Sequence, residues 1–213
     1  MPSPETLLLF LSAAVLVTLA PGPDNLMVIG LSMARGRRAG IAFGVGCGIG
    51  CLSHTLWAVL GVAAMIAAHP NAFLLLRVIG AAYLFWLGGN AIAATFKRQS
   101  APQGNAPISE TFYRAGAVKL FIRGMIANAI NPKVILFFLA FLPQFVVADR
   151  GNAAGQMAVF GVIFTLQAAL IFAGIAAAAG TLGEKLQKNP KVGCWLDRIA
   201  GMVFIALAIK LLI

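Results

Sequence analysis

The chain has very little charge for its length. Only 10% of its 213 residues are Asp, Glu, Lys or Arg, whereas 61% are hydrophobic, and a soluble domain carries about 25% charged residues. It also lacks a Walker-type phosphate loop, a GxGxxG fingerprint and an HExxH pair, so nucleotide-driven transport by this chain and zinc-peptidase chemistry have no support. No polar segment is long enough for a soluble catalytic domain. We therefore expect neither an enzyme nor a cofactor.

The hydrophobic residues form runs that are long enough to cross a bilayer, which takes a helix of about 20 residues. The first run lacks the basic start of a secretory signal peptide, so we expect it to be a retained span. The sequence thus predicts an all-α, multi-pass protein of the inner (plasma) membrane, with one transmembrane domain over 1–213. Six spans are expected, at about 5–33, 40–68, 72–95, 120–147, 153–180 and 196–213.

The distribution of basic residues predicts topology rather than nucleic-acid binding. The net charge is +10, but the basic residues gather in alternate connections between the spans. The other two connections, 68–71 and 148–152, contain only one Lys or Arg residue, Arg150. By the positive-inside rule, the basic connections face the cytoplasm and both termini lie outside. The basic connections contain Arg35, Arg37 and Arg38 in the first, Lys97, Arg98, Arg114, Lys119 and Arg123 in the third, and Lys185, Lys188, Lys191 and Arg198 in the fifth.

The spans divide into two halves that we expect to be inverted repeats. A linker rich in Pro, Gly and Ser, at about 97–119, separates repeat one (about 5–95) from repeat two (about 120–213). Three spans per half give the halves opposite orientations in the membrane. Each half also has Pro and polar residues inside its first span, so spans one and four are expected to be broken. Such paired interruptions are typical of the central site of a transporter.

The two interruptions carry charges at similar depth. Asp24 lies 11 residues before Arg35 and Lys133 lies 10 residues after Arg123, which places both about 15 Å from the cytoplasmic boundary. A charge at that depth costs about 3 kcal/mol and usually faces a cavity or the protein interior. Asp24 is a candidate for the coupling proton, for a substrate ammonium group, or for a plain helix cap. Lys133 is a candidate to bind a substrate carboxylate or to pair with Asp24, unless its side chain extends to the headgroups.

Several uncharged polar residues accompany these charges. Asn131 followed by Pro132 resembles an N-cap followed by the first residue of a new half-helix. Such a helix start would direct its positive dipole end toward the membrane centre. Further hydrogen bonds, either to a zwitterion or between helices, are expected from Asn25, Asn128, Asn131 and Gln167.

The second predicted span has two further patterns. Glycines at 40, 44 and 48, and again at 46 and 50, permit close helix contact with another span or with another copy of the chain. Cys47, Cys51 and His54 share one helix face. They allow a soft-metal site or a thiol pair, although buried packing explains them as well. His54 is retained as a candidate site residue, and no metal site is predicted. The three cysteines give no indication of a structural disulfide.

The two interrupted segments resemble a known family. LAPGPDNLMVIGLSMARGRRAG (19–40) and NAINPKVILFFLAFLPQF (128–145) are similar to the LysE/RhtB family of amino-acid exporters, and the resemblance covers essentially the whole chain. It implies export of amino acids or close derivatives, driven by the proton motive force. On this resemblance, the functional positions of the family's first motif correspond to Pro21, Gly22, Pro23 and Asp24. Those of the second motif correspond to Asn131, Pro132 and Lys133.

The resulting hypothesis is a proton-coupled secondary transporter with a central site between spans one and four. Asn131 and Lys133 would bind the substrate carboxylate, and Asp24 its ammonium group or the coupling proton. The expected partners are an amino acid, protons and the lipid bilayer; a homo-oligomer is left open. Two alternatives remain, a soft-metal exporter and a membrane thiol–disulfide carrier that uses Cys47 and Cys51.

Overall fold

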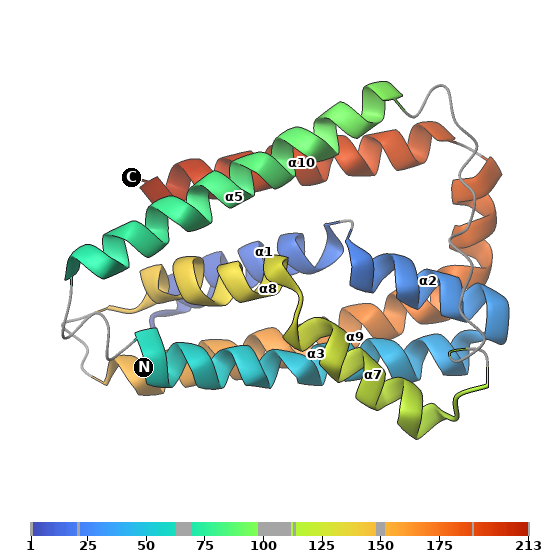
Figure 1. Cartoon of the computed structure of the whole chain (residues 1–213), viewed down its shortest axis with the longest axis horizontal. Coiled ribbons are helices and arrows are strands. Elements are labelled where there is room, and N and C mark those ends of the chain that lie inside the picture. Colours follow the sequence, from blue (N-terminus) through green and yellow to red (C-terminus); the bar gives the residue numbers. More distant parts are fainter. Residues whose placement is uncertain are drawn as a thin grey trace.

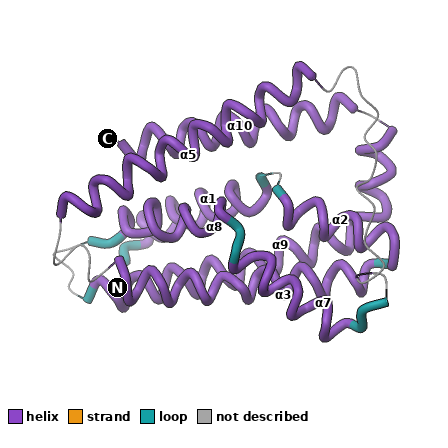
Figure 2. The backbone as a smooth tube through the Cα atoms, in the orientation of Figure 1, coloured by secondary structure: helices purple, strands orange, loops and turns teal. Residues whose placement is uncertain are grey.

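A computed structural model describes most of the chain, namely residues 2–20, 22–62, 70–97, 112, 114–147, 152–188 and 190–212. Throughout these residues every regular element is helical (Figures 1 and 2). The elements are α1 (Pro4–Leu19), α2 (Pro23–Arg35), α3 (Arg37–Trp57), the π-helix η1 (Ala58–Val62), α5 (Pro70–Lys97), α7 (Ala117–Ala129), α8 (Pro132–Leu136), the π-helix η3 (Phe137–Phe141), the 3₁₀-helix η4 (Leu142–Phe145), α9 (Ala153–Lys188) and α10 (Pro190–Leu212).

The helices have the length and composition of membrane spans. Three of them, over Arg37–Gly61, Arg77–Phe96 and Ala153–Ala179, are long and apolar enough to cross a membrane. Two bent pairs raise the number to five: α1 with α2, and α7 with the helices of Pro132–Phe145. The sixth predicted span corresponds to α10, which is helical but is not among these five. An all-α membrane protein is therefore confirmed, and the count of six spans stays a prediction.

Both predicted breaks are present, and proline explains where each new helix starts. The first pair bends by 57° and the second by 52°. Pro23 and Pro132 stand in the first turn of α2 and α8, where the missing N–H of proline removes no intrahelical hydrogen bond. Gly22 is extended, with φ −170°, and so separates α1 from α2. Pro21, which was predicted to be part of this break, lies outside the described residues.

Helix α3 is the centre of the bundle, and its glycines explain why. It packs against α2, α7 and α9. A Cβ atom on Gly48 would lie 2.6 Å from the Cα atom of Ala169 in α9. A Cβ atom on Gly50 would lie 2.7 Å from the carbonyl oxygen of Met125 in α7. These glycines therefore let backbones of the same chain touch, which answers the question of their partner. Whether the protein is also a homo-oligomer stays untested.

The arrangement of the two halves is compatible with the predicted inversion. Corresponding helices of the two halves pack together, α3 with α9 and α5 with α10, which a two-fold relation between them allows. The marked N and C ends lie at the same end of the bundle, and α2 ends at the opposite end, where α3 and α7 begin (Figure 1). The inverted repeat itself stays a prediction.

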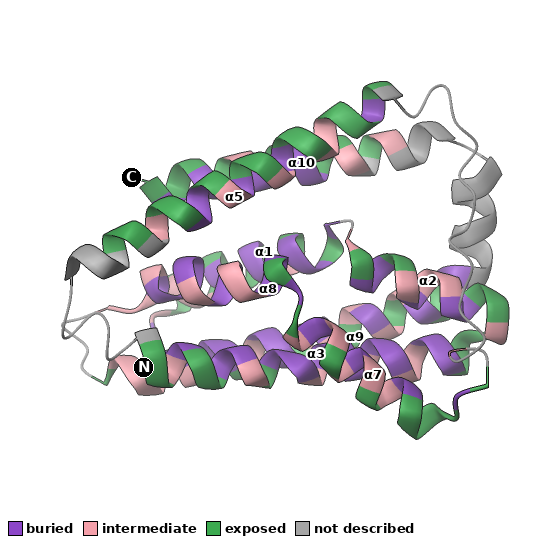
Figure 3. Cartoon of the chain, viewed as in Figure 1, coloured by how far each residue is buried: buried purple, intermediate pink, exposed green. Residues whose placement is uncertain are grey.

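The element boundaries correct two details of the predicted connections. Helix α7 begins at Ala117, inside the predicted linker of 97–119, and residues 98–111 of that linker lie outside the described residues. Helix α9 continues to Lys188, whereas the fifth span was expected to end near residue 180. Buried side chains follow the inward faces of α3 and α9, whereas α5 is largely exposed (Figure 3). Exposed side chains of α5 are mostly large and apolar, as contact with lipid requires.

Candidate functional site

The break in the first span places Asp24 inside the protein. Asp24 lies in the first turn of α2 and is only 3% exposed. Its Oδ2 atom accepts a hydrogen bond from Nδ2 of Asn128 at 2.9 Å and another from Nδ2 of Asn131 at 2.9 Å. The positive end of the α2 dipole also favours a carboxylate here. The alternative that Asp24 merely caps its helix is wrong, because the N-cap of α2 is Gly22.

The break in the second half places Lys133 opposite the end of α1. Asn131 is the N-cap of α8, as predicted, and its Oδ1 atom accepts from the backbone N–H of Lys133 at 3.0 Å. The Lys133 side chain is 6% exposed, and its Nζ atom donates to the carbonyl of Ala20 at 3.0 Å. The alternative that Lys133 extends to the headgroups is therefore wrong. Its ammonium group instead lies near the negative end of the α1 dipole.

Thr18 connects two of the other predicted residues to the break. Its carbonyl accepts from Nδ2 of Asn25 at 3.0 Å, which satisfies a backbone acceptor at the end of α1. Its hydroxyl donates to the carbonyl of Ala14 and accepts from Nε2 of Gln167 at 2.9 Å. Asn25 and Gln167 thus stabilise the end of α1. Their Oδ1 and Oε1 atoms are buried and have no hydrogen-bond partner among the residues that the structure describes.

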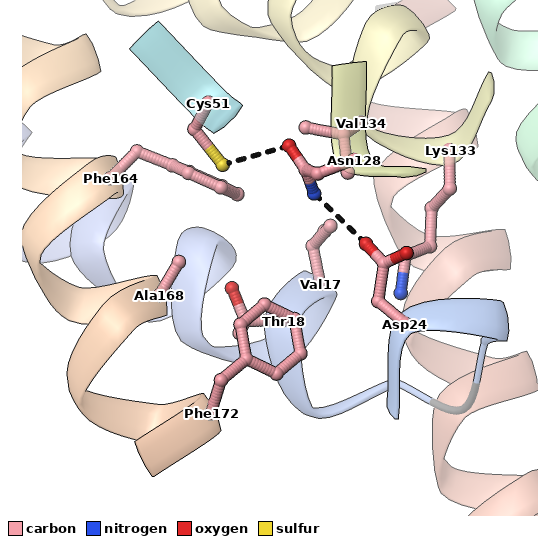
Figure 4. A pocket seen from close by; sticks show the side chains of 10 residues that line it. All are labelled: Val17, Thr18, Asp24, Cys51, Asn128, Lys133, Val134, Phe164, Ala168 and Phe172. Carbon is pink, nitrogen blue, oxygen red and sulfur yellow. Dashed lines mark hydrogen bonds between the residues drawn. The ribbon is translucent and has the colours of Figure 1, made fainter. Parts of the chain in front are cut away.

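A cavity opens between the two breaks (Figure 4). Its volume is about 10 Å³, roughly the space of one water molecule, whereas ligand pockets usually span about 300–1,000 Å³, so a substrate requires the walls to move. Asp24 and Lys133 both line it, which brings the two charges of the broken spans to one site. The remaining lining combines polar and apolar side chains. It consists of Val17, Thr18, Cys51, Asn128, Val134, Phe164, Ala168 and Phe172.

The cavity also includes residues that the sequence did not reveal. Phe164, Ala168 and Phe172 come from α9, where they look like any other residues of an apolar span. Thr18 could have been found, because a hydroxyl three residues before the PGP segment is a donor and acceptor close to freed backbone groups. His54, by contrast, was predicted and lies one layer behind the cavity, with its Nε2 atom 3.0 Å from the carbonyl oxygen of Asn128.

The cysteine face of α3 shows no metal-binding geometry. Cys47 and Cys51 are buried free thiols. Among the residues that the structure describes, no three His, Cys, Asp or Glu side chains are grouped so that they could hold a metal ion. The soft-metal alternative therefore rests on the sequence spacing alone.

Two opposite charges at helix breaks, facing one cavity inside an apolar helical bundle, define the class of this protein. It is a multi-span membrane protein, and charged breaks of this kind in two spans are typical of secondary transporters. The family model described as "LysE type translocator" matches residues 15–213, so the chain belongs to the LysE family of membrane transporters and is not an enzyme. The resemblance to that family is thereby confirmed.

Individual relatives span nearly the whole chain. A leucine efflux protein of Salmonella typhimurium is 31% identical over 207 residues, 95% of this chain and 92% of the relative. A leucine efflux protein of an Enterobacter species is 27% identical over 205 residues, with the same coverage of 95% and 92%. An uncharacterized membrane protein of Pseudomonas aeruginosa is 28% identical over 202 residues, again 95% and 92%. No solved structure is significantly similar to this chain.

Proposed function

We propose that the protein exports neutral amino acids with aliphatic side chains from the cytoplasm, in exchange for protons. The observation that carries this proposal is the composition of the cavity. A zwitterion needs one anionic and one cationic partner, and Asp24 and Lys133 line the same cavity. The rest of its wall is largely apolar, with two phenylalanines from α9, Phe164 and Phe172.

The cavity wall also favours a neutral substrate over a basic one. Asp24 is the one carboxylate among the lining residues that the structure describes. A basic side chain would leave a second cation without a partner in an apolar environment, which is costly. The names of the Salmonella and Enterobacter relatives, leucine efflux proteins, agree with an aliphatic substrate.

In the proposed cycle, substrate and proton compete for Asp24. Lys133 and the start of α8 bind the substrate carboxylate, because a helix N-terminus and an ammonium group both favour an anion. Ionised Asp24 binds the substrate ammonium group on the cytoplasmic side. A proton that arrives from outside neutralises Asp24, removes its attraction for the ammonium group, and so releases the substrate. In this proposal the protein lies in the inner membrane, and the basic ends of α2, α3 and α7 face the cytoplasm.

The experiment is export of L-leucine by proteoliposomes under an imposed pH gradient. Asp24→Asn keeps the shape and the two hydrogen-bond acceptor contacts of the side chain, but it cannot titrate. We expect it to abolish gradient-driven export, whereas Glu5→Gln, which changes an exposed carboxylate at the start of α1, keeps parental rates. Unchanged gradient-driven export by Asp24→Asn would show that proton coupling does not depend on this residue.

A second substrate arm separates the remaining alternatives. The double variant Cys47→Ser, Cys51→Ser removes thiolate ligands and disulfide chemistry while it keeps hydrogen-bonding side chains of similar size. We expect the double variant to export leucine. Complete loss of this export, together with movement of a soft metal ion by the parent, would favour the metal-exporter alternative.

A further inference from the structure

Asn128 at the end of α7 makes hydrogen bonds through both its side chain and its backbone carbonyl. It is 0% exposed. Its Nδ2 atom donates to Asp24, and its Oδ1 atom lies 3.3 Å from the thiol of Cys51, which donates to it. Its backbone carbonyl accepts from the N–H of Asn131 at 2.9 Å and from Nε2 of His54 at 3.0 Å. Two residues of α3, one turn apart, therefore hold both the side chain and the backbone of the residue that contacts Asp24.

These contacts determine which way the Asn128 amide points. An amide could present either its NH₂ group or its oxygen to a neighbour. A donor at Cys51 requires the oxygen on the α3 side, which leaves the NH₂ group for Asp24 (Figure 4). The Cys51 thiol has a second acceptor, the carbonyl of Cys47, but at the longer distance of 3.6 Å. The His54 ring must carry its proton on Nε2, because a carbonyl only accepts.

The α3–α7 contact makes this arrangement rigid. A Cβ atom on Gly50 would lie 2.7 Å from the Met125 carbonyl and 3.0 Å from Cβ of Asn128, so the two backbones touch beside the asparagine. Cys51 and His54 are 0% and 3% exposed. A donor fixed on one packed helix therefore sets the geometry of a group on the next, with little room for another rotamer.

We propose that Cys51 and His54 are positioning residues that hold the Asn128 amide so that it donates to Asp24. This inference goes beyond the proposed function but rests on it where it concerns the coupling proton. A hydrogen bond donated to a carboxylate stabilises its ionised form. Loss of the Cys51 donor leaves the amide oxygen without this partner and loosens the hold on the amide, so its bond to Asp24 weakens and the ionised carboxylate is less stabilised. The same face of α3 that resembles a metal or thiol site is thus a support for the carboxylate.

The test must account for the other titratable groups near Asp24. Among the described residues they are Lys133 on α8 and Cys47, Cys51 and His54 on α3. Helix α9 contributes uncharged side chains to this wall, with Phe164, Ala168 and Phe172. The substitutions below leave Lys133 in place and change one α3 residue at a time.

The test compares variants that keep a donor with variants that lose it. Cys51→Ser and His54→Gln keep one, whereas Cys51→Ala and His54→Leu do not. In proteoliposomes with L-leucine, we expect Cys51→Ala to move the pH midpoint of export upward by about 0.5–1 unit, the equivalent of one weak hydrogen bond. Cys51→Ser should restore the parental midpoint. Cys47→Ala is the matched control, since it removes an equally buried thiol and leaves the Cys51–Asn128 contact in place.

A second measurement does not depend on transport. Thermal unfolding in detergent is followed for Cys51→Ala, Asn128→Ala and the double variant. A direct contact makes the two decreases in Tm non-additive, by about 1–4 °C for a chain of this size. The decreases in Tm for Cys47→Ala and Asn128→Ala should be additive. Additive losses for Cys51 and Asn128, or equal pH midpoints for Cys51→Ala and Cys51→Ser, would overturn the proposal. Failure of the parent to export leucine would refute the proposed function and leave the thermal cycle to judge the contact.

Discussion

Replacement of Lys133 by methionine tests whether the two buried charges form one site. Methionine keeps much of the length of the side chain but loses the ammonium group, so the carbonyl of Ala20 loses the donor that lies 3.0 Å away. A hydrogen bond to a charged group contributes about 1.5–3 kcal/mol. Asp24 is also left as a buried charge without its cationic neighbour, although the amides of Asn128 and Asn131 still donate to it. We expect a total loss of about 2–4 kcal/mol of stability, which lowers Tm by roughly 5–15 °C.

The double variant Asp24→Asn, Lys133→Met identifies the cause of that loss. If the unpaired carboxylate is responsible for part of it, removal of both charges should recover about half of the Tm decrease, because breaking a buried pair costs more than removing it. Thermal unfolding of purified protein in detergent measures this recovery. Neither Lys133→Met nor the double variant should show leucine export driven by a pH gradient. A double variant that is as unstable as the sum of the two single variants would show that Asp24 and Lys133 do not interact, and it would refute the reasoning that they share one site.

The remaining predictions concern packing and topology. Gly48→Leu should strongly destabilise the protein, because even a Cβ atom there would lie 2.6 Å from the backbone of Ala169. Gly89→Leu in α5 should be tolerated, since no neighbouring atom of the described part of the chain lies within 4 Å of its Cβ position. Thermal unfolding of the two variants measures the difference, and equal losses would contradict the assigned α3–α9 contact. Reporter fusions in the 98–111 linker should show it in the cytoplasm, and fusions at either terminus should show it outside. A linker reporter on the outer side would reverse the proposed orientation.

Much of the architecture could be predicted because it depends on local and one-dimensional properties. Apolar length predicted helices of membrane-spanning size, and proline predicted the two breaks, since a residue without an N–H can only start a helix or interrupt it. Asn131 was recognised as an N-cap from its place before Pro132. Asp24 and Lys133 were singled out because an ionisable group deep in an apolar span is costly and seldom accidental.

The partners of these residues could not be predicted in the same way. The sequence allowed Asp24 to cap its own helix and Lys133 to extend to the headgroups, and only the packing of distant helices excluded both. Asp24 accepts from amides that lie 104 and 107 residues away along the chain. The glycines of α3 were recognised as contact residues, but their partners in α7 and α9 depend on how the spans are arranged around one another.

The sequence by itself determined that this is an all-helical membrane protein of the LysE family with charged breaks in two spans, because hydropathy, proline and the two motifs are properties of short segments. The sequence also predicted a central site between the two breaks, but only the tertiary structure shows which side chains line that cavity. The tertiary structure also decided that α9 supplies the aromatic part of the cavity wall, and that Cys51 and His54 both contact Asn128. These are consequences of close packing between helices far apart in the chain, where a shift of one residue changes every partner.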